Sequence, residues 1–285
     1  MAEYHIESGI RRRRSRDCRT LVMALALSVT GYSPAAFSAD TTDDITIKRV
    51  RSGLSAGIDV VHGNLGFASE TVNSEIQLTA MPAVSFGLDL WPEEHIGLYV
   101  DGYFGTGATI DGVLDAEVPI TTMEYHLGGR YRWFLGHDSR AIAWGLGLSV
   151  HGFHQWVQDQ RPAVLLDRVI IGPRMTPFLT VPLFDGDFWV RSGVFAEHPF
   201  FVREAPSDSG NPMSFFAWGA QIQCVQSILP RWGVQLQGEF LTRSMEFDGL
   251  GTRGAGIENG TTADRFLRFG VAIRYLTLEF ENEAK

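Results

Sequence analysis

The chain has 285 residues, of which 45% are apolar, and it carries 24 basic against 33 acidic side chains. This length accommodates one closed barrel or two small domains. An acidic chain without a basic surface to neutralise phosphates is a poor partner for nucleic acid. Cys224 is the one cysteine outside the N-terminal segment that contains Cys18, so we expect no internal disulfide and no thiolate metal site.

The N-terminus has the pattern of a secretory signal peptide. Six arginines between Arg11 and Arg19 precede the apolar run Leu21–Val29, and small residues follow up to Ser38. The apolar run is shorter than the roughly 20 residues that a transmembrane helix needs. We expect a signal peptide at residues 1–38, with cleavage after Ala39 as the alternative. Its removal would leave 18 basic and 30 acidic residues, a net charge of −12.

After a predicted periplasmic tail at residues 39–52, apolar and polar residues alternate with the period of two that is typical of β-strands. About ten segments show this pattern. A count of eight or twelve strands also fits, because Ile45–Val50 could pair and the prolines of Pro177–Pro182 are awkward inside a strand. In chain order the segments cover residues 54–62, 82–90, 96–103, 122–133, 142–151, 171–181, 188–197, 216–224, 232–243 and 267–275.

The connections between these segments alternate in length. Short links lie at 92–95, 136–139, 185–187 and 229–231, and long links at 63–74, 106–120, 157–167, 203–212 and 246–264. Outer-membrane barrels combine short periplasmic turns with long external loops. The sequence therefore predicts an all-β fold, an antiparallel up-and-down transmembrane β-barrel at residues 53–280 followed by a C-terminal tail at 281–285.

Alternation by itself does not say which face of the wall lies inside. A soluble periplasmic lipocalin-like binding barrel would turn the apolar face inward, whereas a membrane barrel turns it toward lipid. With the residues that extend these segments toward the links, the predicted strands run to about thirteen or more residues, longer than the roughly 9–11 needed to cross hydrocarbon. Aromatic residues also gather near both strand ends, which favours the membrane. The polar face, which would line the lumen, then carries Asp101, Glu124, Arg130, Arg132, Arg174, Arg191, Glu239, Arg268 and Arg274.

These charged residues allow two interpretations. They pair across the lumen and plug it as an Arg/Glu/Gln network, or they line a narrow polar pore. A barrel of about ten strands leaves little open bore between such long side chains, so a wide general porin is not expected.

The last predicted strand places Arg268, Gly270, Ile273 and Tyr275 at the spacing of a closing-strand signal. In this respect the chain resembles the outer-membrane β-barrel proteins of diderm bacteria, although a charged tail follows Phe280 where such chains usually end on an aromatic residue. The resemblance implies insertion by the barrel assembly machinery, residence in the cell outer membrane, and contact with outer-membrane lipid and lipopolysaccharide. We expect a monomer with a structural, interaction or narrow-pore role.

Residues suited to chemistry are few. A loop-side rim site for a divalent cation or for acid–base hydrolysis could be formed by four histidines and four acidic residues. His151 and His154 do not share a strand face, and the acidic and His–Asp pairs of the omptins and the neighbouring His–Ser of the lipid A deacylases are missing from the sequence. We therefore assign no catalytic, cofactor or metal residues, and an outer-membrane hydrolase remains the alternative. The histidines are His62, His151, His154 and His198, and the acids Asp159, Asp167, Glu197 and Asp264.

Overall fold

The computed structural model describes residues 52–70, 73–110, 117–136, 141–157, 166–184, 187–252 and 258–276. These residues form eleven strands and no helix long and apolar enough to cross a membrane. They belong to the compact unit Ile47–Lys285, and the other unit, Met1–Thr46, lies outside the described residues with the predicted signal peptide. The strands are β1 (Gly53–Ala68), β2 (Asn73–Leu90), β3 (Ile96–Ile110), β4 (Glu117–Leu135), β5 (Ile142–Val157), β6 (Asp167–Leu183), β7 (Phe188–Glu197), β8 (Phe201–Ala205), β9 (Asn211–Leu229), β10 (Trp232–Asp248) and β11 (Thr261–Leu276).

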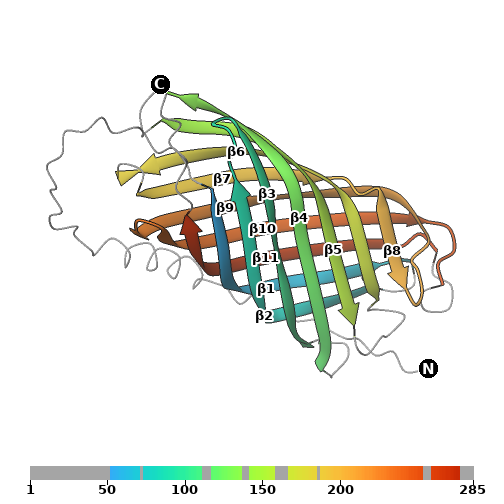
Figure 1. The fold of residues 1–285 in the computed structure, drawn as a ribbon. Helices are drawn as coiled ribbons and strands as arrows, with labels where there is room; N and C mark the ends of the chain where they lie inside the picture. The colour runs from blue at the N-terminus through green and yellow to red at the C-terminus, as the bar shows by residue number, and fades with distance from the viewer. Residues whose placement is uncertain are drawn as a thin grey trace, which may run out of the picture. The chain divides into compact units, whose positions relative to one another are not determined.

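The strands form one closed antiparallel wall (Figure 1). Strands that follow one another in the chain pair with each other except at β8, where β7 pairs with β9 instead. β1 closes the wall against β11, with Asp59 opposite Gly270. This confirms the predicted up-and-down barrel. The end of the wall at residues 91–95, 136 and 230–231 is called the turn end below, and the opposite end the loop end.

The eleven described strands occupy ten positions, because β7 and β8 follow one another along β6. β7 pairs with β6 from Leu183 to Arg174, and β8 pairs with it from Ile171 to Asp167. Between them the backbone nitrogen of His198 donates to the Pro173 carbonyl oxygen at 3.1 Å. The expectation of about ten strands is confirmed, with one strand interrupted.

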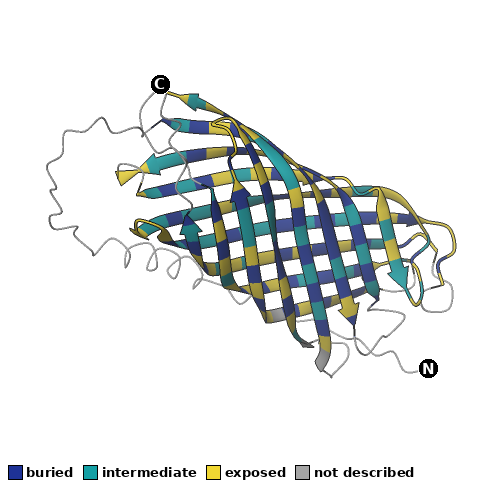
Figure 2. Cartoon of the chain, viewed as in Figure 1, coloured by how far each residue is buried: buried dark blue, intermediate teal, exposed yellow. Residues whose placement is uncertain are grey.

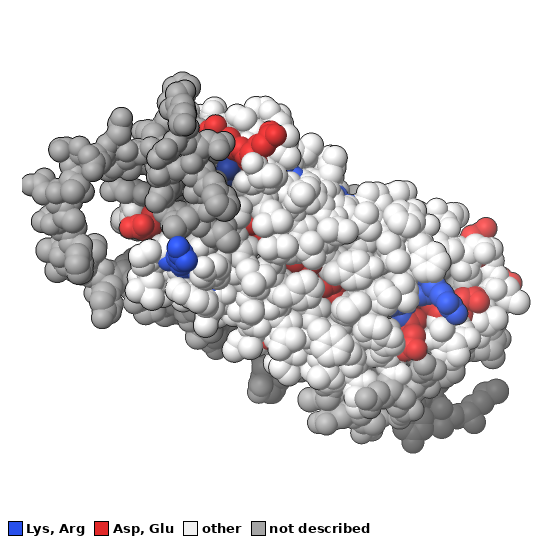
Figure 3. Space-filling model, in the orientation of Figure 1, with Lys and Arg blue, Asp and Glu red and all other residues white. Residues whose placement is uncertain are grey.

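The predicted apolar face lies outside the barrel. Ile58 is 71% exposed, Leu148 59% and Ile273 61%, and buried residues alternate with more exposed ones along most strands (Figure 2). On the face shown in Figure 3, charged atoms gather mainly toward the two ends, and the broad band between them shows few charged atoms. A soluble monomer rarely exposes so large an apolar surface. The lipocalin-like alternative is therefore rejected.

The polarity of the wall reverses toward the loop end. Along β1, Ile58 and Val60 point outward, but farther along the strand Leu65 and Phe67 point inward and are buried while His62 and Asn64 point outward. In the outward layer, the Asn64 side-chain nitrogen donates to a Glu75 carboxylate oxygen at 3.1 Å. The loop-end part of the barrel therefore resembles a water-soluble barrel with its apolar residues inside.

This reversal corrects two expectations. β1 extends to Ala68 and β2 begins at Asn73, so most of the predicted loop 63–74 is strand, and β3 likewise extends to Ile110. In this part of each strand the apolar residues occupy the inward positions instead of the outward ones. Tracing a strand in the sequence by its outward apolar residues therefore makes it too short. In β2 the change comes with a register shift opposite Val61 to Gly63, beside Ala80 with its positive φ of 44°.

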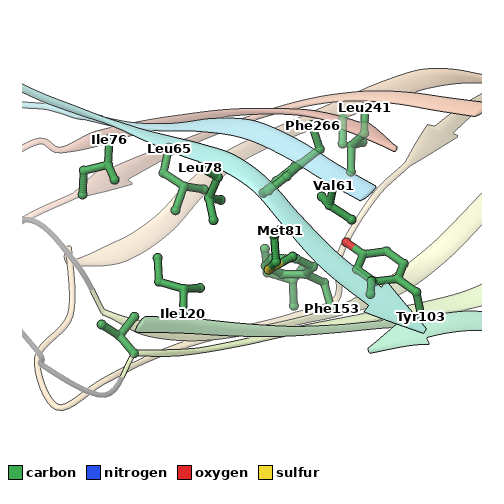
Figure 4. Packing of buried hydrophobic residues seen from close by; sticks show 14 of the residues in the cluster. Val61, Leu65, Ile76, Leu78, Met81, Tyr103, Ile120, Phe153, Leu241 and Phe266 are labelled. Carbon is green, nitrogen blue, oxygen red and sulfur yellow. The ribbon is translucent and has the colours of Figure 1, made fainter. Parts of the chain in front are cut away.

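The second corrected expectation is a polar interior along the whole barrel. Inside the loop-end half, apolar side chains from opposite parts of the wall point toward one another and pack together (Figure 4). We call this group the loop-end core. Its members include Val61, Leu65, Ile76, Leu78, Met81, Tyr103, Ile120, Phe153, Val157, Ile170, Phe195, Leu241, Met245, Phe247 and Phe266.

The wall has an unpaired seam between β8 and β9. β8 pairs with β6, and β9 pairs with β10 along its length but with β7 only as far as Ala217. Within the part of the chain that the structure describes, no backbone hydrogen bond joins residues 201–205 to 211–216. Phe200 and Phe216 beside this seam are 71% and 62% exposed.

Candidate functional site in the barrel lumen

At the turn end, three arginines converge on one carboxylate oxygen. Oδ2 of Asp89 lies 3.3 Å from Arg130 Nη1, 3.1 Å from Arg191 Nη1 and 3.5 Å from Arg274 Nη2. Each side chain occupies an inward position of its strand, and all four are almost fully buried. One carboxylate facing three guanidiniums leaves this group, the turn-end cluster, with two positive charges in excess.

A second ion pair spans the β1–β11 closure. Arg268 Nε lies 3.5 Å from Asp59 Oδ2, and its Nη2 lies 3.1 Å from Glu239 Oε2. The Gln237 side-chain nitrogen donates to Asp59 Oδ1 at 3.0 Å, and the Ser85 hydroxyl donates to the same oxygen at 3.0 Å. The Asp59 carboxylate is thus surrounded by donors from β2, β10 and β11.

A third group, the histidine cluster, lies toward the loop-end core. His126 Nδ1 donates to Asp101 Oδ1 at 2.8 Å, and its Nε2 lies 3.3 Å from Glu124 Oε1. His151 Nε2 lies 3.6 Å from the same Glu124 oxygen, and its Nδ1 lies 3.3 Å from Glu197 Oε2. The two imidazole rings are stacked with their centroids 5.0 Å apart. Glu124, His126 and His151 form the one group among the described residues whose ligand atoms lie close enough together to hold a metal ion.

Arg174 joins these carboxylates. Its Nη1 donates to His126 Nε2 at 2.7 Å and to Glu239 Oε1 at 3.2 Å, and it lies 3.5 Å from Glu197 Oε1. Its Nη2 donates to Gln221 Oε1 at 3.1 Å. The guanidinium therefore links four strands across the lumen.

Arg243 connects the histidine cluster to the loop-end core. Its Nη2 lies 3.7 Å from Glu197 Oε2, and its guanidinium carbon lies 4.6 Å from the centre of the Phe153 ring. Above the core, Arg168 Nη1 donates to Asp264 Oδ2 at 2.6 Å, and its Nε lies 3.4 Å from Glu204 Oε1. The core thus lies between two charged layers.

A cavity of about 80 Å³ adjoins the turn-end cluster. A cavity needs only about 10–15 Å³ of this volume to hold one water molecule, so this cavity has room for several waters. Charged and amide side chains from both the turn-end cluster and the Arg268 ion pair line it. They include Asp89, Asp101, Arg130, Arg191, Gln221, Gln223, Gln235, Gln237, Glu239, Arg268 and Arg274.

The nine lumen residues predicted from the sequence all take inward positions. Eight of them belong to the adjoining clusters, whereas Arg132 lies apart at the turn end, where its guanidinium carbon is 3.7 Å from the centre of the Trp91 ring. Its Nε donates to the Glu94 carbonyl oxygen at 2.6 Å. Prediction missed several network members. Asp59, Asp89, His126, His151 and Arg243 also belong to it, together with Glu197 and the glutamines of β9 and β10, which the predicted Arg/Glu/Gln network included only as a class.

Several of these missed residues carried a visible signal. Asp89, His126 and His151 fall on the polar face of their strands by simple alternation. Their importance comes from partners on other strands, which alternation does not identify. His126 meets Asp101 from the neighbouring strand, and Asp89 meets Arg274 across 185 residues of sequence.

The candidate rim site does not assemble as a unit. His151 and Glu197 meet, but inside the barrel beneath the core, while His62 and His154 occupy outward positions on their strands. Asp264 pairs instead with Arg168. Asp159 lies outside the described residues.

The four residues of the predicted assembly signal lie on β11. Arg268 and Gly270 face the lumen, and Ile273 and Tyr275 take outward positions. Recognition of these residues by the assembly machinery remains a prediction.

The closed antiparallel wall, its apolar outer belt and its charged interior define a transmembrane β-barrel. Barrels of this construction are integral proteins of the bacterial outer membrane, and this chain is one of them. No family model and no curated protein matches its sequence.

Among solved structures, the chain is similar to the outer membrane protease OmpT from Escherichia coli, with 8% identity, 83% of this chain and 100% of that chain covered, and a TM-score of 0.41. It is also similar to OprG from Pseudomonas aeruginosa (9% identity, 81% and 99% covered, TM-score 0.37) and to Neisserial surface protein A (10%, 79% and 97%, 0.31). At this level of similarity, neither activity nor ligand carries over.

Proposed function

We propose that this protein is a non-conducting outer-membrane barrel whose function is exerted at its loop end, as a structural or interaction protein. The loop-end core carries this proposal. Val61, Met81 and Phe153 are fully buried inside the barrel, and Leu241 and Phe266 are 2% and 6% exposed. An ion crossing this layer would lose its hydration without gaining polar partners, which is strongly unfavourable.

The charged network supports the same proposal from the other side of the core. Arg174 of β6 contacts carboxylates of β7 and β10, so its side chain crosses the lumen. Arg268 of β11 bridges carboxylates of its two neighbouring strands, β1 and β10. Ion pairs with this many hydrogen bonds hold long side chains in place. In this proposal the apolar layer is the main seal, and the ionic layer narrows the lumen next to it.

The loop-end wall is where contacts with the surroundings are expected. Its outward side chains are polar, as at Asn64 and Glu75, so this part suits water and lipid head groups better than hydrocarbon. We infer contacts with lipopolysaccharide head groups there and with lipid along the apolar belt, by a monomer inserted by the barrel assembly machinery.

A narrow pore is the second candidate, favoured by the cavity of about 80 Å³ beside the turn-end cluster. This cavity would be the inner vestibule of such a pore if the loop-end core could part. A rim hydrolase has less support, because His151 and Glu197 lie beneath the core and not at the surface.

Conductance in a planar bilayer tests the proposal. The refolded protein is compared with the double variant Phe153→Ala with Met81→Ala, which thins the core, and with Phe200→Ala, an exposed aromatic outside it. We expect silence from the wild type and from Phe200→Ala, and discrete openings from the double variant.

Discrete openings of the wild type would contradict the proposal and support the pore. If the double variant is silent as well, the further variant Arg174→Ala with Arg268→Ala in the thinned barrel shows whether the ionic layer alone seals it. Heat-dependent migration on a gel verifies that each variant has folded.

A further inference from the structure

Two histidines inside the barrel present the same ring nitrogen to one carboxylate oxygen. Nε2 of His126 lies 3.3 Å from Glu124 Oε1, and Nε2 of His151 lies 3.6 Å from it. In a tetrahedral zinc site with ligand distances of about 2.0–2.2 Å, neighbouring ligand atoms are about 3.3–3.6 Å apart. We propose that Glu124, His126 and His151 form a binding site for a divalent transition metal, with zinc as the ion that fits best.

The opposite ring nitrogens support this assignment. His126 Nδ1 donates to Asp101 Oδ1 at 2.8 Å, and His151 Nδ1 lies 3.3 Å from Glu197 Oε2. Histidines that bind metals usually donate their second ring nitrogen to a carboxylate, which fixes the tautomer and the ring orientation. Both rings have this arrangement, so both direct Nε2 toward Glu124.

Two of the three ligand atoms are also buried without hydrogen bonds. Glu124 Oε1 and His151 Nε2 have no hydrogen-bond partner among the described residues, and these two side chains are 5% and 2% exposed. Buried polar atoms nearly always have a partner, and an orphaned one calls for an explanation such as an ion. A bound cation would satisfy both atoms at once.

The local charge has the sign that a cation requires. With neutral histidines, five carboxylates in and beside the histidine cluster face three guanidiniums, so two negative charges are in excess. The two positive charges in excess in the turn-end cluster lie on the other side of the cavity, so the negative excess near the histidines favours a cation at the site itself. The acids are Asp59, Asp101, Glu124, Glu197 and Glu239, and the arginines are Arg174, Arg243 and Arg268.

Arg174 competes for the same position. Its Nη1 donates to His126 Nε2 at 2.7 Å and lies 3.8 Å from Glu124 Oε1, so it partly takes the place of a metal. The guanidinium is also held over the Phe195 ring and by Gln221. These contacts are independent of the histidine and can retain the side chain when Nη1 withdraws. Arg174 therefore lowers the metal affinity of the site.

Calorimetric titration with zinc chloride tests the site, using the refolded full chain freed of metal in detergent. Titration with cobalt chloride adds a spectroscopic readout, because tetrahedral cobalt absorbs visible light strongly. We expect one ion per barrel. Arg174→Gln should bind at least about tenfold more tightly, because a like charge within a few ångströms of the ion is removed. Asp101→Asn should bind about 10–100-fold more weakly.

The double variant His126→Ala with His151→Ala should lose binding, and His154→Ala, on the outward face of the same strand as His151, should retain it. Heat-dependent gel migration verifies folding. The proposal is overturned if neither the wild type nor Arg174→Gln binds zinc or cobalt, or if the double histidine variant folds and still binds. If the double variant does not fold, the comparison of Arg174→Gln with the wild type decides, and equal affinities would overturn the proposal.

Discussion

Gly270 faces the carboxylate of Asp59 where β11 pairs with β1 and closes the barrel. A Cβ added at Gly270 would overlap this carboxylate, and it would also approach the Gln237 side-chain nitrogen. The glycine therefore gives Asp59 the space in which it pairs with Arg268. A residue predicted as part of an assembly signal also has a packing role in the lumen.

Gly270→Ala should lower the free energy of unfolding by about 1–3 kcal/mol, because the added methyl group overpacks a buried ion pair. Urea unfolding in detergent, followed by tryptophan fluorescence, measures this. Gly129→Ala is the matched control, since its Cβ would meet its nearest neighbour, the Gly97 carbonyl oxygen, at 3.6 Å. Equal effects of the two substitutions would show that the Asp59 contact is unimportant.

Ile58 and Asn64 point outward from the same strand but lie in zones of opposite polarity. Ile58→Arg should destabilise the barrel in lipid by about 2–4 kcal/mol, because it places a charge on the membrane-facing wall. Asn64→Arg should change stability by less than about 0.5 kcal/mol, as expected of a surface substitution. Unfolding in lipid vesicles gives both values. A large cost for Asn64→Arg would place the membrane boundary nearer the loop end.

Asp89 is the carboxylate that holds three arginines together in the turn-end cluster. Asp89→Asn should lower the free energy of unfolding by about 3–5 kcal/mol, because it leaves buried guanidiniums without a counter-ion. Glu75→Gln, an exposed change at the loop end, is the control.

Added sulfate should stabilise Asp89→Asn more than the wild type, since the anion can replace the lost carboxylate. Thermal unfolding at several sulfate concentrations, with the ionic strength held constant by chloride, checks this. A similar sulfate response in both proteins would contradict the assignment of excess positive charge to this cluster.

The seam between β8 and β9 should exchange amide hydrogens faster than the rest of the loop-end wall. Residues 201–205 and 211–216 lack pairing with each other, whereas Thr261–Phe266 pair on both sides. A missing hydrogen bond of about 1 kcal/mol corresponds to exchange about fivefold faster. Hydrogen exchange by mass spectrometry measures it, and equal protection of the two regions would mean that the seam is closed in solution.

The membrane-facing half of the wall follows from the sequence alone. Ile58, Leu148 and Ile273 alternate with polar residues at a period of two, and this period is a local property of a strand, so strand number, connectivity and the outward face could be predicted. The polar face likewise identified Arg174, Arg268 and Glu239 as lumen residues.

Only the tertiary structure decided how the inward residues combine. The reversal of polarity beyond Val60, the loop-end core and the meeting of Glu124 with His151 depend on register and on closure of the wall, which bring together strands far apart in sequence. Alternation reports which face a side chain takes, and it contains no information about the height or the partner that the side chain meets across the lumen. For this reason the barrel could be predicted from local pattern, while its seal and its histidine cluster could not.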